Sequence, residues 1–365
     1  MANDTESIKE QLRARTAPLT FKSSDLLSTG SALLNLACTG RACGGFPKGK
    51  YIFFVGDSDS GKTWICLTCM AEASQNPDFK NYVFVYDNVE DGALMSIEYF
   101  FGKALVARLR PPAKDGKGNP IYSTTVESFY YHLDDCLAKA RRTGKPFIYV
   151  LDSQDSLTSH AANEKFSEQK ESFEKGREQI GSYGDGKAKV HSENIRRVLI
   201  GLRETGSILI VIGQTRDNLG FGMETKTRSG GRALKFYAAV EIWSSIKEKI
   251  RRRVKGKDRQ VGIVARIKIK RNRITGKDPE ILVPIYDSYG LDDIGSCVSF
   301  LIEEKHWGVE KGVVSAKGFG FAGTEEELIH YIEEKHLELD LRDLVEEVWN
   351  EIEEACAIKR QPRYL

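Results

Sequence analysis

Four short apolar runs recur along the first part of the chain, and longer stretches with helical spacing of apolar residues separate them. Runs of this length are typical of parallel strands that are buried on both faces and joined by crossover helices. We therefore expect an α/β fold with a mostly parallel central sheet flanked by helices. The four runs are residues 51–55, 82–86, 147–151 and 208–213.

Polar residues follow each of these runs, at the point where the predicted strand ends. The first run is followed by Gly56, the third by Asp152 and the fourth by Gln214, while Asp87 and Glu90 follow the second. The carboxyl ends of parallel strands meet at one edge of a sheet, where ligands bind. Four separate segments are thus predicted to contribute to one site.

The rest of the chain has a different pattern. Residues 239–244 and 261–269 alternate apolar and polar side chains, which predicts strands with one face less buried. Helical spacing follows from about residue 291, and Thr324 and Glu327 form a capping box before an apolar run. With 365 residues, the chain exceeds what one core of roughly 250 to 300 residues accommodates. We expect an N-terminal arm (1–30), a large core (31–288) and a small α-rich domain (289–365).

The composition is that of a soluble protein, with 41% hydrophobic and 29% charged residues. No apolar run approaches the roughly 20 residues that cross a bilayer, and the first residues lack a signal-peptide layout. We expect a cytoplasmic protein without a membrane partner. The seven scattered cysteines favour free thiols, and Cys66 and Cys69 lack the second pair that a zinc site needs.

The net charge of +2 hides a strong asymmetry between two regions. Residues 247–277 hold fourteen Lys and Arg against two acids, whereas residues 324–356 hold thirteen acids against two bases. The basic block suggests a polyanionic partner. A solvated basic surface is the alternative interpretation.

Residues 56–63, GDSDSGKT, satisfy the Walker A pattern between a predicted strand and a predicted helix at 64–73. The glycines let the backbone curl its N–H groups around phosphates, and the helix N-terminus adds partial positive charge. Lys62 would reach the β and γ oxygens, and Thr63 would offer its hydroxyl to Mg²⁺. The predicted nucleotide-binding residues are Gly56, Asp57, Ser58, Asp59, Ser60, Gly61, Lys62, Thr63 and Trp64.

Two further groups are needed for hydrolysis of a bound triphosphate. Asp152 ends the third run, where a carboxylate can hold Mg²⁺ together with Thr63, although a helix N-cap is the simpler alternative. A carboxylate must also orient or deprotonate the attacking water. Asp87 and Glu90 are the candidates at the end of the second strand.

Five stretches resemble the RecA family, and the resemblance extends in order over about residues 27–273. The last of them, SGGRALKFYA, matches the family's most recognisable run. The resemblance implies a RecA-type P-loop ATPase core and an ATP-hydrolysing recombinase that forms a filament on single-stranded DNA. It also implies strand exchange with homologous double-stranded DNA, in recombination and repair. The stretches are residues 27–31, 44–49, 147–153, 212–216 and 229–238.

The resemblance also assigns roles to individual residues. Lys62 would contact the reacting phosphate, Gln214 would sense the γ-phosphate and Glu90 would be the catalytic base. The chain departs from the family here, because two residues instead of one separate Asp87 from Glu90. Arg271 and Arg273 stand where the family carries two cations that cross the subunit interface to the neighbour's nucleotide.

Two segments resemble the family's DNA-binding loops, residues 159–190 and 216–230. The first is longer than usual and includes a charged, helix-prone stretch at 164–179, which either alters DNA contacts or forms a solvated helix. The second has cations for phosphates and apolar side chains that can wedge between bases. Its predicted DNA-binding residues, with the adjoining glycine, are Arg216, Phe221, Met223, Lys226, Arg228, Gly230 and Gly231.

Two alternative functions remain open from the sequence. A hexameric replicative helicase shares the nucleotide core, but the run at 229–238 favours the recombinase. A DNA-binding mediator that keeps ATP as a structural ligand would tolerate the irregular spacing before Glu90.

Overall fold

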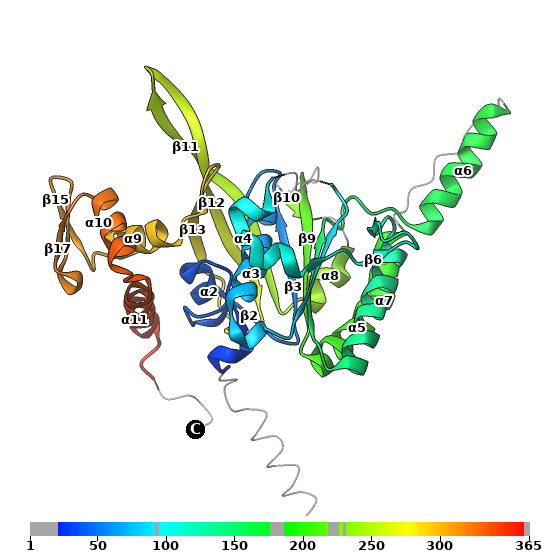
Figure 1. Ribbon diagram of the computed structural model, residues 1–365, viewed down its shortest axis with the longest axis horizontal. Helices are drawn as coiled ribbons and strands as arrows, with labels where there is room; N and C mark the ends of the chain where they lie inside the picture. Colours follow the sequence, from blue (N-terminus) through cyan, green and yellow to red (C-terminus); the bar gives the residue numbers. More distant parts are fainter. Residues whose placement is uncertain (1–20, 92–94, 176–185, 218–225, 229–230, 361–365) are drawn as a thin grey trace, which may run out of the picture.

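One large sheet runs through the molecule, with helices on both faces (Figure 1). The computed structural model describes residues 21–91, 95–175, 186–217, 226–228 and 231–360. The strand order is β14–β13–β12–β11–β3–β9–β8–β4–β5, and β10 pairs with β9. The strands are β3 (Tyr51–Gly56), β4 (Val83–Asn88), β5 (Leu109–Arg110), β8 (Phe147–Asp152), β9 (Ile208–Asp217), β10 (Lys226–Arg228), β11 (Val240–Val254), β12 (Lys257–Asn272), β13 (Glu280–Tyr286) and β14 (Gly290–Leu291).

The expected α/β fold is confirmed, and its centre is the set of four predicted parallel strands. β3 pairs with β9, β9 with β8 and β8 with β4, all in parallel. Along β3, Ile52 and Phe54 pack into one core, whereas Phe53 and Val55 pack into the core on the other face. All four side chains are fully buried. This two-sided burial explains why the strands are continuous apolar runs.

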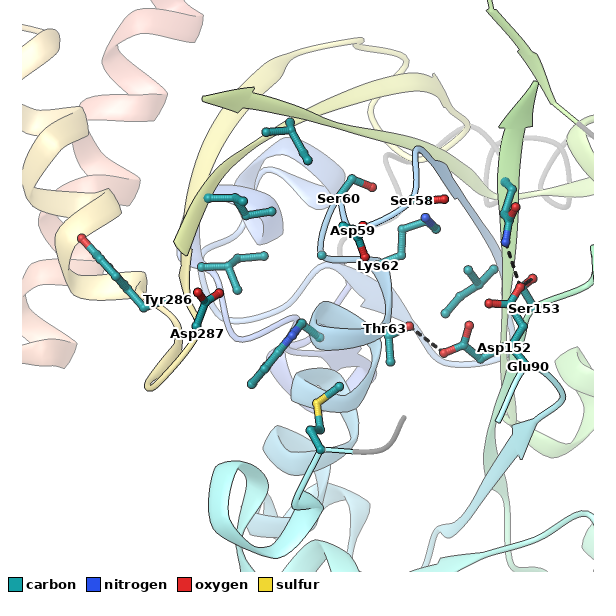
Figure 2. A pocket seen from close by; sticks show the side chains of 18 of the residues that line it. Ser58, Asp59, Ser60, Lys62, Thr63, Glu90, Asp152, Ser153, Tyr286 and Asp287 are labelled. Atoms are coloured by element: carbon teal, nitrogen blue, oxygen red, sulfur yellow. Dashed lines mark hydrogen bonds between the residues drawn. The ribbon is translucent and has the colours of Figure 1, made fainter. Parts of the chain in front are cut away.

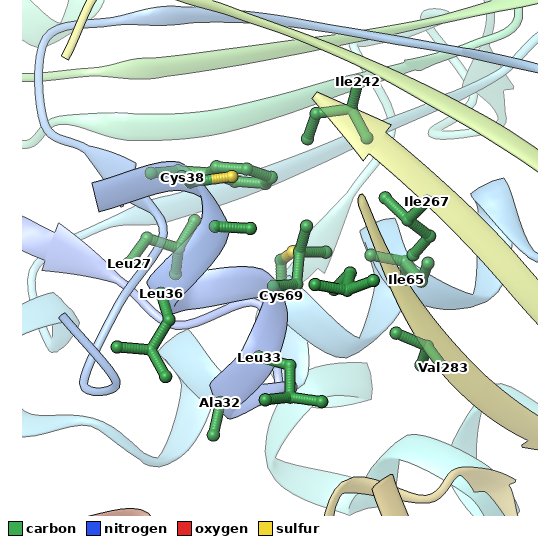
Figure 3. Packing of buried hydrophobic residues seen from close by; sticks show 14 of the residues in the cluster. Leu27, Ala32, Leu33, Leu36, Cys38, Ile65, Cys69, Ile242, Ile267 and Val283 are labelled. Atoms are coloured by element: carbon green, nitrogen blue, oxygen red, sulfur yellow. The ribbon is translucent and has the colours of Figure 1, made fainter. Parts of the chain in front are cut away.

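Each face of the sheet has its own helices. Figure 3 shows one of the two cores, to which α2 contributes Leu36, α3 contributes Cys69 and β12 contributes Ile267. Cys69 is fully buried, as expected of a small core residue. The first face is covered by α2 (Ala32–Thr39), α3 (Lys62–Gln75) and α4 (Ile97–Arg108), and the second by α5 (Val126–Thr143), α7 (Lys187–Thr205) and α8 (Gly231–Tyr237).

The connecting segments contain several shorter elements and one projecting helix. Helix α6 (His160–Glu174) extends away from the body of the molecule at the upper right of Figure 1, and none of its residues is buried. It lies in the predicted first DNA-binding loop, and residues 164–174 of the charged stretch are helical. The short elements are η1 (Ser23–Asp25), β1 (Leu26–Leu27), β2 (Phe46–Pro47), η2 (Pro77–Phe79), β6 (Ala113–Lys114), β7 (Pro120–Ile121) and η3 (Lys317–Phe319).

Strands β11 and β12 are much longer than the alternating pattern predicted. They continue beyond the sheet as an exposed antiparallel hairpin, which projects at the upper left of Figure 1. Lys255 and Gly256 connect the strands with φ angles of 50° and 76°. Two consecutive positive φ angles are typical of the tight turn that suits the twist of a hairpin. Much of the basic block therefore lies on this hairpin.

The C-terminal part contains the expected helices and one unexpected sheet. The predicted capping box is confirmed, since the side chains of Thr324 and Glu327 each accept a hydrogen bond from the other residue's backbone N–H. The main sheet also continues to β14, just beyond residue 288. The elements are α9 (Asp293–Glu303), the antiparallel strands β15 (Gly308–Glu310), β16 (Val313–Ala316) and β17 (Phe321–Gly323), then α10 (Glu325–Lys335) and α11 (Glu338–Cys356).

Within the described ranges, no helix combines the length and the apolar character needed to span a lipid bilayer.

The two-sided burial of β9 predicts a large effect of a cavity there. Ile210 is fully buried, so Ile210→Ala should lower the free energy of unfolding by about 3 kcal/mol. Ile200 on α7 is 52% exposed, and Ile200→Ala should change the free energy of unfolding by less than about 0.5 kcal/mol. Urea denaturation of both variants measures the difference. Equal effects of the two substitutions on the free energy of unfolding would contradict the burial of Ile210 in the core.

Candidate nucleotide-binding site

The loop between β3 and α3 has the curled backbone that the glycine pattern predicts. A Cβ atom at Gly56 would lie 2.6 Å from the carbonyl oxygen of Ser244, so only glycine fits there. Gly61 has a φ of 86°, and a side chain at this position would collide with Ile285. The hydroxyl of Ser244 on β11 donates to the carbonyl of Ser60 at 2.6 Å. The neighbouring strand therefore holds the loop in place.

This loop forms one wall of a pocket of about 600 Å³ (Figure 2). Glu90 follows β4, Asp152 ends β8 and Gln214 lies where β9 stops pairing with β3, and all three reach the same pocket, as the strand-end argument predicted. The opposite wall was not predicted. It comes from β11, β12 and the end of β13, and includes Lys249, Gln260, Ile263, Ile285, Tyr286 and Asp287.

Lys62 and Asp152 are the buried charges of this pocket. Burial lowers the pKa of Lys62, and the nearby carboxylates of Asp152, Glu90 and Asp57 oppose that effect. Burial also raises the pKa of Asp152, although hydrogen bonds from Thr63 and Tyr86 favour its charged form. In a partly desolvated site, a cation and a carboxylate interact strongly with ions of opposite charge.

The described side chains fit a phosphate chain with a divalent cation. The Lys62 ammonium and the backbone N–H groups at the start of α3 are suited to phosphate oxygens. The Thr63 hydroxyl donates to Asp152 Oδ2 at 2.7 Å, and Tyr86 donates to the same oxygen at 2.9 Å. A hydroxyl and a carboxylate so placed are oxygen ligands of the kind that Mg²⁺ prefers.

Glu90 and Asp87 have different environments, although both follow or end the same strand. Glu90 Oε1 accepts hydrogen bonds from Gln214 Nε2 at 2.9 Å, from Ser156 Oγ at 3.1 Å and from Ser153 Oγ. Figure 2 shows Glu90 and Ser153 beside Asp152 at the pocket. Of the two carboxylates, Glu90 is therefore the one that faces the pocket.

Asp87 is fully buried and does not line the pocket. Its carboxylate accepts bonds from the backbone N–H of Ser123 at 2.9 Å, from the Ser123 hydroxyl at 2.6 Å and from Tyr149 at 2.7 Å. These three donors connect β4 to β8 and to the segment before α5. Asp87 thus has the contacts of a structural residue.

Arg271 and Arg273 lie outside the pocket of their own chain. The backbone N–H of Arg273 bonds to the carbonyl of Ala239, whose own N–H bonds to Tyr51 at the start of β3. The phosphate loop follows the other end of β3, so the two arginines lie at the opposite edge of the sheet. Both guanidinium groups lie over the ring of Phe236, at 5.3 and 5.4 Å from its centre.

Phe236 is a candidate functional residue that the sequence did not indicate, because only its contacts with Arg271 and Arg273 distinguish it. The ring is 56% exposed although it lies between two cations.

Most of the predicted DNA-binding side chains lie outside the described part of the chain. Phe221, Met223 and Gly230 are not described, nor are residues 1–20 of the predicted arm and residues 176–185 of the first loop. Within the predicted second loop, Arg216 on β9 pairs with Thr227 on β10, which lies between Lys226 and Arg228. Gly231 begins α8 with a φ of 75°.

Comparisons with known proteins agree with this architecture. A family model described as the RecA N-terminal domain matches residues 170–291. Protein RecA of Caulobacter sp. (strain K31) is 26% identical over 304 residues, 81% of this chain and 71% of that protein. Protein RecA of Rubrobacter xylanophilus is 28% identical over 308 residues, 83% of this chain and 75% of that protein.

The chain is similar to RecA proteins over about four-fifths of its length. The segment that matches the family model contains Gln214, Arg271 and Arg273. The phosphate loop, Glu90 and Asp152 precede that segment and lie within the same fold.

The raised pKa of Asp152 has a consequence for stability. The folded protein binds a proton at this carboxyl more readily than the unfolded chain does, so its ionised form lowers stability above the raised pKa. Asp152→Asn removes that charge. We expect the nucleotide-free variant to have a higher Tm than the wild type at pH 7, and the difference to narrow as the pH falls through the raised pKa.

Differential scanning calorimetry over this pH range measures the effect. The matched control is Asp134→Asn, which neutralises an exposed carboxylate paired with Arg197 on the surface. A Tm difference for Asp152→Asn that does not depend on pH would show that desolvation of the charge is not its cause.

Proposed function

We propose that this protein is an ATP hydrolase that forms a helical filament on single-stranded DNA and promotes pairing and strand exchange with homologous double-stranded DNA. Its similarity to RecA proteins supports a role in recombination and repair in general. The observation that carries the finer proposal is the bond from Gln214 Nε2 to Glu90 Oε1. It joins a candidate catalytic carboxylate to a residue two positions before the predicted second DNA-binding loop.

In this mechanism the phosphate loop and Lys62 bind the triphosphate, and Thr63 and Asp152 hold Mg²⁺. The metal would neutralise charge that develops on the phosphate oxygens during transfer. Glu90 orients the attacking water and accepts its proton. Glu90 lines the same pocket as Lys62 and Asp152, which supports this role.

Gln214 has a second role in the proposal. Its amide donates to Glu90, and a γ-phosphate is an alternative acceptor with a greater charge. An exchange of acceptors would move the start of residues 216–230. Thr215 adds a second connection to the nucleotide site, because its hydroxyl donates to the carboxylate of Asp57 in the phosphate loop.

The subunits of the filament would complete each other's sites. Arg271, Arg273 and the exposed ring of Phe236 are remote from the pocket of their own chain, which supports a role toward a neighbouring subunit. A planar guanidinium can contact phosphate oxygens at two points, as an arginine finger does. Hydrolysis would then depend on assembly.

Two parts of the chain support the proposed binding of DNA. The sequence of the predicted second loop contains Arg216, Lys226 and Arg228, which would contact phosphates, and Phe221 and Met223, which would contact bases. The β11–β12 hairpin presents further exposed cations outside the sheet, among them Arg251 and Arg253. A polyanion such as double-stranded DNA fits that second surface.

Substitution of Glu90 tests the catalytic assignment. Glu90→Gln should keep ATP affinity and filaments but lower DNA-dependent hydrolysis about a hundredfold, because the positioned base is lost. Asp87→Asn should lower the Tm instead, because its amide NH₂ would face the donors of Ser123 or Tyr149. Phosphate release, nucleotide binding and Tm are measured for both. Loss of hydrolysis at unchanged Tm for Asp87→Asn alone would reverse the assignment.

A mixture of two inactive variants tests the shared site. Arg273→Ala and Glu90→Gln should each be inactive alone, but random assembly of equal amounts places both intact residues at about a quarter of the interfaces. We expect the mixture to recover DNA-dependent hydrolysis to about a quarter of the wild-type rate. Electron microscopy establishes whether mixed filaments form, and it also separates filaments from rings. Mixed filaments without recovered hydrolysis would exclude the shared-site mechanism.

A further inference from the structure

Asp155 lies four residues before the first predicted DNA-binding segment (159–190) and contacts Gln214, two residues before the second (216–230). It follows Asp152 by three residues and is half-buried at the end of β8. Its carboxylate oxygen Oδ2 accepts the backbone N–H of Gln214 at 2.7 Å. Asp155 belongs to none of the motifs on which the family resemblance rests.

Asp155 is itself held in place from two sides. The side-chain amide of Gln154 donates to the same Oδ2 oxygen at 3.0 Å, and the backbone N–H of Gln154 bonds to Ile212 on β9 at 3.0 Å. Gln154 is almost fully buried. The carboxylate therefore has a defined position relative to β9, and this position fixes the backbone of Gln214.

A third contact connects Asp155 with the far end of the first segment. Lys187, the first residue of α7, donates from its ammonium group to the carbonyl oxygen of Asp155 at 3.2 Å. The loop at 159–190 thus leaves the body beside Asp155 and returns to it through Lys187. One residue contacts the roots of both loops.

The same residue lies one step from the candidate catalytic carboxylate. Gln214 receives its backbone anchor from Asp155, while its side chain donates to Glu90 at 2.9 Å. Ser156, the next residue after Asp155, also donates to Glu90 at 3.1 Å. A change in the contacts of Glu90 or of the Gln214 side chain would therefore act on the Gln214 backbone, which Asp155 holds in place.

We propose that Asp155 is a positioning residue that couples the nucleotide state at Glu90 and Gln214 to the placement of the two DNA-binding loops. The proposal rests on the function proposed above. Coupling of this kind is a free energy that links two binding equilibria, and it is measured as the change in one affinity caused by the other ligand. If the carboxylate only stabilised its turn, its removal would change the Tm of the protein without changing the effect of nucleotide on DNA affinity.

The test is the nucleotide dependence of DNA affinity in the full-length protein. The dissociation constant of a labelled poly(dT) oligonucleotide is measured with ADP and with a nonhydrolysable ATP analogue, and the ratio of the two is compared among variants. Asp155→Ala should lower this ratio toward one, because a coupling between the two sites of about five- to 150-fold would be lost. Asp155→Asn should retain the ratio within about threefold, because its amide oxygen still accepts from Gln214.

The control is Asp134→Ala, which makes the same change of side chain at an exposed position of α5 and should leave the ratio as in the wild type. Lys187→Met is a second variant that keeps the carboxylate and removes the contact to the first loop, and it should also lower the ratio. It keeps the test decisive if Asp155→Ala does not fold.

Two outcomes overturn the proposal in distinguishable ways. A wild-type ratio in both Asp155→Ala and Lys187→Met, with DNA binding intact, would show that Asp155 does not couple the sites. A wild-type protein that binds neither ATP nor single-stranded DNA would instead remove the proposed function, and this inference with it.

Discussion

Burial of β3, β9, β8 and β4 on both faces is the constraint on which the rest of the structure depends. The described side chains in the middle of these strands are buried, so a polar group reaches solvent only near the end of a strand's parallel pairing. The phosphate loop, Asp152 and Gln214 all occupy such ends, and parallel pairing brings the ends to one edge. The site is therefore a consequence of how the core is packed.

Desolvation at this edge divides the site into two kinds of group. Lys62 and Asp152 are held against the core, where burial weakens the charged form of each and makes an ionic ligand more favourable. Glu90 follows β4 and contacts the side chain of Gln214 on β9 and two serine hydroxyls. The groups proposed to bind the nucleotide are thus more deeply buried than the groups proposed to act on water and on the loops.

Several elements were predicted well because their signals are local. The parallel strands, helix α3 and the capping box of α10 depend on neighbouring residues or on a regular period. The outer half of the β11–β12 hairpin has water on both faces, so its charged residues show no alternation and conceal the strands. Strands β15, β16 and β17 have only three or four residues each, which is too short for a period to be recognised.

The sequence by itself determined the α/β class, the phosphate loop and the set of strand-end residues, because burial period and the Walker A spacing are properties of short segments. Only the tertiary structure showed that Glu90, and not Asp87, faces the pocket. The two carboxylates lie three positions apart near the end of one strand, but that of Asp87 contacts Ser123 and Tyr149, which are distant in sequence. The wall with Lys249 and Tyr286, and the contacts of Asp155 with Gln214 and Lys187, likewise depend on segments that folding alone brings together.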